Sequence, residues 1–150
     1  MDIDQFKAAQ AEFRKIVEEK GKEVLESAFT RFFERCPEVT AVQWTQYAPG
    51  FNDGEPCTFG LGEVYFRMDK SVDPSMFRYE PDNDEDEGPM YSAWSMDDKF
   101  GSKGAMHDFE GLLNQLEEIL EPTFGDDKRI TVSMKDGELQ FEEDYYDCGY

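Results

Sequence analysis

Basic residues are scarce in this sequence. Fifteen Lys and Arg stand against 35 Asp and Glu among 150 residues, which gives a formal net charge of −20. A surface of that charge repels the phosphate backbone of nucleic acids and the anionic headgroups of membranes, so we expect direct binding to neither. The same field attracts basic proteins and speeds their encounter at low salt. The charge therefore predicts a basic protein partner, or it serves solubility alone.

Cysteine and histidine are also rare. The three cysteines, Cys36, Cys57 and Cys148, form no C-x-x-C pair, and His107 is the one histidine. This spacing argues against a disulfide framework and against a zinc site. We expect no metal and no cofactor. The N-terminus is acidic and no apolar run reaches 18 residues, so the sequence predicts a cytoplasmic protein without a signal peptide or membrane span.

Motifs of catalysis are missing as well. There is no P-loop, no G-x-G-x-x-G and no G-x-S-x-G. The acidic run from Asp82 does not fit an EF-hand loop, because its sixth position is Glu87 rather than glycine. Acid–base catalysis needs a carboxyl group in a dry pocket, where its pKa rises. Only Asp53, Glu55 and Glu63 stand among aromatic residues, and an enzyme or small-ligand or cation binder using them is the alternative function.

Apolar residues at helical spacing predict one long helix over about 3–34, ended by Pro37. Gly21 falls on the apolar side, where we expect a second element to cross closely. The pattern assigns the whole apolar stripe to the buried face of this helix. The stripe consists of Ile3, Phe6, Ala9, Phe13, Ile16, Val17, Val24 and Ala28.

A second apolar stripe, from Ala105 to Leu120, predicts a helix with Ser102 as its N-cap and Pro122 as its end. His107 lies opposite this stripe, so we expect it in solvent.

Alternating residues predict strands over 39–47 and 56–68, the second with a bulge at Gly62. Asp136-Gly137 between two alternating runs predicts a hairpin over 129–141. Residues 69–98 hold ten acids and two bases.

Within that acidic region we expect a mobile, solvated loop over about 69–90 and a short strand over 90–96. Hairpin-linked strands imply a mainly antiparallel sheet of four to five strands, with the two amphipathic helices packed on one face. The sequence thus predicts a single α+β domain over 1–150.

The stretch WTQYAPGFNDGEP, residues 44–56, has two interpretations. Its Pro-Gly and Asn-Asp-Gly turns suit a loop that joins two antiparallel strands. Its aromatic and acidic residues also suit a recognition surface.

This stretch also carries a resemblance. VQWTQYAPGFNDGEPCTFGLGEVYF, together with the late KDGELQFEEDYYD, resembles a family of small uncharacterised bacterial and phage proteins with a W-T-Q-Y…F-N-D-G…C-x-F core motif. The likeness is strongest over 39–68, and the tail EEDYYDCGY departs from the family's ending. The resemblance implies a microbial or viral origin and carries over no catalytic residue.

These observations predict a small acidic binding protein that inhibits or regulates a basic protein. A sharper form is a phage-type inhibitor of a nucleic-acid-binding protein, in which carboxylates imitate the phosphates of DNA. A homo-oligomer formed through the second face of the sheet is a further alternative, and the oligomeric state stays open. The expected binding residues are Trp44, Tyr47, Phe51, Asp53, Glu55, Tyr79, Asp82, Asp84, Glu85, Asp86, Glu87, Tyr145 and Tyr146.

Overall fold

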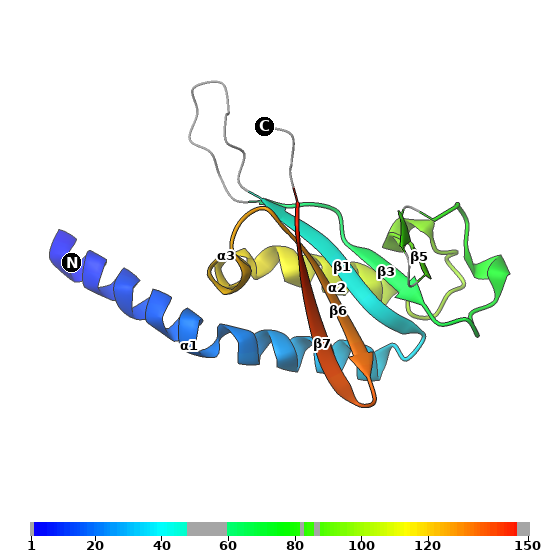
Figure 1. Cartoon of the computed structure of the whole chain (residues 1–150), viewed down its shortest axis with the longest axis horizontal. Helices are drawn as coiled ribbons and strands as arrows, with labels where there is room; N and C mark the ends of the chain where they lie inside the picture. The colour runs from blue at the N-terminus through cyan, green and yellow to red at the C-terminus, as the bar shows by residue number, and fades with distance from the viewer. Residues whose placement is uncertain (1, 48–59, 82, 86–87, 147–150) are drawn as a thin grey trace, which may run out of the picture.

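The computed structural model of the chain describes residues 2–47, 60–81, 83–85 and 88–146. In this part of the chain, α-helices lie on one face of a five-stranded antiparallel sheet (Figure 1). The strand order is β2-β1-β6-β7, and β3 also pairs with β1. The predicted α+β fold with a mainly antiparallel sheet is confirmed.

Helix α1 spans Ile3–Arg35, as predicted. Asp2 begins it with a capping box: its side chain accepts the backbone N–H of Gln5, and the Gln5 side chain accepts that of Asp2. The helix ends at Cys36, whose backbone N–H donates to the carbonyl of Phe32. Figure 1 shows the N-terminal part of α1 extending beyond the edge of the sheet.

The second predicted helix is divided in two. Helix α2 spans Lys103–Gln115 and α3 spans Glu117–Phe124. Leu116 separates them, and its N–H is shared between two carbonyls of the preceding turn. The prediction that Pro122 ends the helix is wrong: Pro122 lies inside α3, which ends at Gly125 with a positive φ of 83°.

Ser102 precedes α2 at the predicted N-cap position. Its side chain does not cap the helix. The hydroxyl donates instead to a carboxylate oxygen of Glu38 at 2.8 Å, which ties the start of α2 to the turn after α1.

Strand β1, Val39–Tyr47, is the centre of the sheet. On one side it pairs with β6, Lys128–Lys135, which pairs in turn with β7, Glu138–Tyr145. On its other side it pairs with β2, Gly60–Leu61, and β3, Tyr65–Met68. Each strand is antiparallel to its neighbours, as hairpin connections require.

Two turn predictions hold. Asp136 and Gly137 have φ values of 53° and 79°, the left-handed pair that a two-residue hairpin needs between β6 and β7. The chain between β2 and β3 breaks at Gly62, whose N–H donates to the carbonyl of Thr45 at 2.8 Å. A Cβ atom on Gly62 would collide with the Thr45 side chain, which would have to move to admit any other residue.

The segment over about 69–90, predicted as a mobile, solvated loop, contains regular elements in the residues that the structure describes. A 3₁₀ turn forms at Pro74–Met76, and β4, Asn83–Glu85, pairs with β5, Gly88–Met90. The segment is held to the core because Met90 is fully buried and Tyr91 pairs with Phe66 of β3. The expected mobility of this segment stays a prediction.

The predicted strand over 90–96 is also wrong, because Ala93–Ser95 forms a 3₁₀ turn. Tyr91 and Met96 on either side of it make only isolated bridges, to Phe66 and Phe77.

The core lies between the helices and the inner face of the sheet. Phe29 of α1 is at its centre, stacked on Trp44 of β1 at 5.7 Å and edge-on to Phe109 of α2 at 5.0 Å. Such ring pairs add stability beyond the area they bury. The C-terminal half of α1 is therefore fixed to the body of the protein.

Candidate protein-binding groove

Helix α1 carries large apolar side chains, most of them in its N-terminal half, that nothing in the described structure covers. Phe6 is 53% exposed and Phe13 is 51% exposed, and three further apolar residues of α1 are about as open. The prediction that the whole stripe is buried is wrong for these residues and for Ala9, which is also exposed. Contiguous exposed apolar surface marks interaction sites in folded proteins. We call Ile3, Phe6, Phe13, Ile16 and Val24 the exposed stripe.

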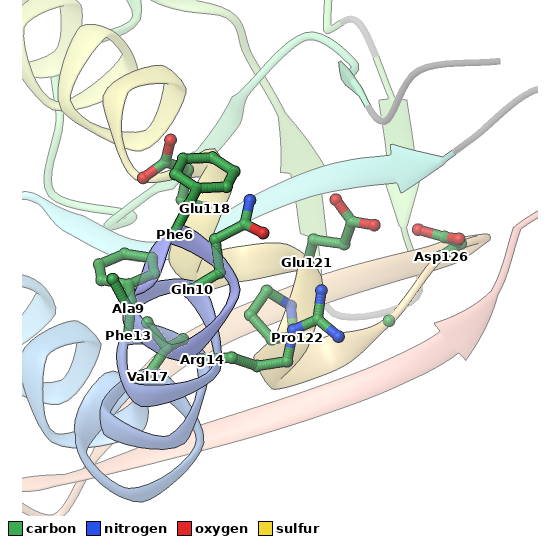
Figure 2. A pocket seen from close by; sticks show the side chains of 11 residues that line it. Phe6, Ala9, Gln10, Phe13, Arg14, Val17, Glu118, Glu121, Pro122 and Asp126 are labelled. Atoms are coloured by element: carbon green, nitrogen blue, oxygen red, sulfur yellow. The ribbon is translucent and has the colours of Figure 1, made fainter. Parts of the chain in front are cut away.

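A groove of about 900 Å³ lies between this half of α1 and α3 (Figure 2). We call it the α1–α3 groove. The α1 wall consists of Phe6, Ala9, Gln10, Phe13, Arg14 and Val17, and the α3 side consists of Glu118, Glu121, Pro122, Gly125 and Asp126. One wall is thus mainly apolar, and the other carries three carboxylates.

Helical periodicity explains why these side chains share a groove. Phe6, Gln10, Phe13 and Val17 follow each other at intervals of four, three and four residues, which keeps them on one face of α1. Glu118 and Glu121 are three residues apart and therefore share one face of α3.

Gly21 continues the same series of positions, and α3 crosses α1 there. A Cβ atom on Gly21 would lie 3.1 Å from both Cγ2 of Ile119 and Oγ1 of Thr123. The predicted close approach at this glycine is confirmed. The crossing bounds the α1–α3 groove at one end.

Beyond this crossing the same face of α1 lines a second groove of about 920 Å³, against α2. Val24, Ala28, Arg31 and Arg35 repeat the intervals of four, three and four residues. This second groove has three carboxylates and two arginines, and on its α2 side Asp108 is the one acidic residue of the lining. The acidic wall is therefore a property of the α1–α3 groove.

Gln46 of β1 fixes α3 in place. Its side-chain nitrogen donates to the carbonyls of Leu120, at 3.0 Å, and Gly125, at 2.6 Å. Gln46 is fully buried, and its bond to Leu120 is made away from water. Sequence reasoning missed this residue, although its place on the same side of β1 as Val42 and Trp44 indicates a buried polar group that needs partners.

The residues expected to bind a partner do not line the groove. Trp44 has no exposed surface and belongs to the core, which removes it from any binding surface. Tyr47 and Tyr146 lie with their rings 6.1 Å apart, while Tyr79 and Tyr145 are 65% and 75% exposed. Asp84 and Glu85 lie in β4. Phe51, Asp53, Glu55, Asp82, Asp86 and Glu87 fall outside the described residues.

One sequence signal could have revealed the groove. A 33-residue helix is about 50 Å long, whereas the nine-residue central strand spans about 30 Å. The sheet cannot cover the whole helix, so part of the apolar stripe must face something else. The periodicity identified the apolar residues of α1 correctly, and only the assignment of the exposed ones to the core was wrong.

A second exposed aromatic site lies on the 3₁₀ turn before α2. Trp94 is 67% exposed, and its ring meets that of His107 edge-on at 4.5 Å. His107 is half-buried against this ring rather than fully in solvent, which corrects the prediction. Neither residue lines the α1–α3 groove or the second groove.

The carboxyl group of Glu110, whose pKa is raised, does not line either groove. Burial raises the pKa of Glu110, the nearby charge of Glu63 adds to the rise, and a hydrogen bond from the Val64 N–H opposes it. Glu63 itself is exposed and accepts a hydrogen bond from the Tyr65 hydroxyl. In the described ranges, no group of three or more His, Cys, Asp or Glu side chains is arranged to hold a metal ion.

No protein-family model, curated protein or solved structure matches the chain. Within the part of the chain that the structure describes, no helix combines the length and apolar character that crossing a bilayer requires.

Proposed function

We propose that this protein is a binding protein rather than an enzyme, and that it docks a basic partner protein through the α1–α3 groove. The observation that carries the proposal is the pairing of an exposed apolar wall, around Phe6 and Phe13, with a wall of three carboxylates. The apolar wall supplies area to bury, and the acidic wall selects the charge of the partner.

The two walls contribute to binding in different ways. Covering half-exposed Phe6 and Phe13 removes apolar surface from water, at about 25 cal/mol for each Å². Aromatic anchors of this kind carry much of the affinity of an interface. The carboxylates of Glu118, Glu121 and Asp126, within a net charge of −20, act mainly on the rate of encounter and on the choice of partner.

A finer form of the proposal is that the partner is itself a nucleic-acid-binding protein. The net charge of −20 supports it, because carboxylates on such a surface can occupy the places of phosphates. The resemblance to bacterial and phage proteins is compatible with an inhibitor of this kind. Duplex DNA should then compete with this protein for the partner, and lack of competition would remove the finer form alone.

The test is affinity capture with three immobilised proteins: wild type, Phe6→Ser with Phe13→Ser, and Tyr145→Ser. We expect the wild type and Tyr145→Ser to retain the same basic proteins from a microbial lysate at about 50 mM salt and to release them at high salt. The double variant should retain far less of them. Equal retention by all three proteins would contradict the proposal, and loss with Tyr145→Ser alone would assign binding to β7.

A further inference from the structure

We infer that the partner segment held in the α1–α3 groove is an amphipathic basic helix. Its apolar side would lie on Phe6, Phe13 and Val17, and its Lys and Arg residues would face Glu118, Glu121 and Asp126. The inference rests on the proposed function and adds the chemical and conformational class of the ligand.

The walls of the groove favour a helix over an extended strand. Both walls are α-helices, whose backbone N–H and C=O groups are largely used in bonds within each helix. A strand in this groove would find no sheet edge with which to pair, whereas a helix needs only side-chain contacts. The intervals of four, three and four residues along α1 also match the ridges and grooves of a second helix.

The length of the groove sets the size of the ligand. Its α1 wall runs from Phe6 to Val17, which is about 17 Å along the helix axis. A ligand helix of about three turns covers this distance. Such a helix presents an apolar row to the α1 wall, with basic residues on the flank that faces α3.

The charges of the groove favour a cationic ligand. Arg14 is the one basic residue of the lining, against the three carboxylates of Glu118, Glu121 and Asp126. Basic side chains can lay their aliphatic stems along Pro122 and direct their charges to these carboxylates.

A second copy of this chain is the main competing occupant. It would bring another net charge of −20 to the site, and this repulsion weakens as salt screens it. Self-association would therefore strengthen with salt, whereas binding of a basic helix weakens with salt. Opposite salt dependences separate the two occupants.

The probe is a labelled synthetic peptide of about 14 residues, with leucine at helical spacing and lysine elsewhere. A scrambled peptide of the same composition measures attraction by charge alone, and a peptide with Glu in place of Lys tests the sign of the charge. Fluorescence anisotropy with the whole protein, at about 50 and 300 mM salt, gives each affinity.

Two double variants with the same change in net charge locate the binding. Glu118→Lys with Glu121→Lys reverses the acidic wall, while Glu138→Lys with Glu142→Lys makes the same change at exposed positions of β7. At the higher salt we expect the amphipathic peptide to bind the wild type about tenfold more tightly than the scrambled peptide. Reversal of the acidic wall should weaken the affinity for the amphipathic peptide about tenfold, and the change on β7 should weaken it less than about threefold.

Each result decides the inference. Equal binding of the amphipathic and scrambled peptides, or equal losses in the two variants, would overturn it. Self-association that strengthens with salt, seen by light scattering, would assign the groove to a second copy. If the peptides fail while capture from lysate still depends on Phe6 and Phe13, the proposed function stands and the helical ligand is wrong. If neither depends on the groove, both proposals fail.

Discussion

The indole nitrogen of Trp44 donates a hydrogen bond to the side-chain oxygen of Gln46 at 3.0 Å, and neither residue has any exposed surface. The amide nitrogen of the same glutamine holds α3 through the carbonyls of Leu120 and Gly125. One buried side chain therefore uses its oxygen within β1 and its nitrogen on the helix that carries the acidic wall. The position of that wall depends on β1 as much as on α3.

Replacing Gln46 by methionine should lower the free energy of unfolding by about 3 kcal/mol, because it leaves one buried donor and two carbonyls without these partners. Urea denaturation measures the loss. Gln140→Met, at an exposed position of β7, is the matched control and should change stability by less than about 0.5 kcal/mol. Equal stability of the two variants would show that Gln46 does not hold α3.

Phe13 and Phe109 should respond very differently to alanine. Phe109 is buried in the core, so Phe109→Ala should cost about 3–5 kcal/mol. Phe13 is half-exposed, and Phe13→Ala should cost less than about 1 kcal/mol. Chemical denaturation of both variants makes the comparison. A large loss for Phe13→Ala would mean that the exposed stripe serves stability.

Gly21 and Gly111 offer a matched pair of helical glycines. At Gly21 a leucine meets Ile119 and Thr123, and we expect a loss of about 1–3 kcal/mol despite the better helix propensity of leucine. At Gly111 nothing lies within 4 Å of the added Cβ, so Gly111→Leu should stabilise α2 by up to about 1 kcal/mol. Thermal unfolding of the two variants gives the sign of each effect. A gain at both positions would contradict the close crossing of α1 and α3.

Glu110→Gln should stabilise the protein at neutral pH. Burial and the charge of Glu63 raise the pKa of Glu110 in the folded protein. The folded state therefore favours the protonated carboxyl, and the wild type loses stability as the pH rises through this raised pKa. The amide oxygen of Gln can still accept the Val64 N–H. The difference in unfolding free energy between variant and wild type should therefore be positive at pH 7 and vanish below about pH 4. A difference that does not vary with pH would rule out the ionised carboxyl as its cause.

Local signals in the sequence determined much of the fold. The Asp136-Gly137 pair predicted the hairpin because few residues adopt two successive positive φ values. The apolar stripe predicted α1 because helical periodicity acts within one helix.

Features that depend on distant contacts were missed. The break at Leu116 has no strong local signal in the sequence. The pairing of β4 with β5 was missed because proline and acidic residues usually indicate loops. Trp44 was assigned to a surface because a stretch rich in turn residues follows it directly, although its side of β1 faces the core. The groove itself depends on how far α1 extends beyond the sheet, which becomes visible only when the lengths of helix and sheet are compared.

NMR titration of the isotope-labelled protein with the amphipathic Lys–Leu peptide, at about 300 mM salt, measures groove binding most directly. We predict that backbone amide shifts change along residues 3–17 of α1 and 117–126 around α3, with little change along β7. Shift changes spread over the acidic segment 69–98, or confined to β7, would show that charge alone attracts the peptide and that the α1–α3 groove is not the binding site.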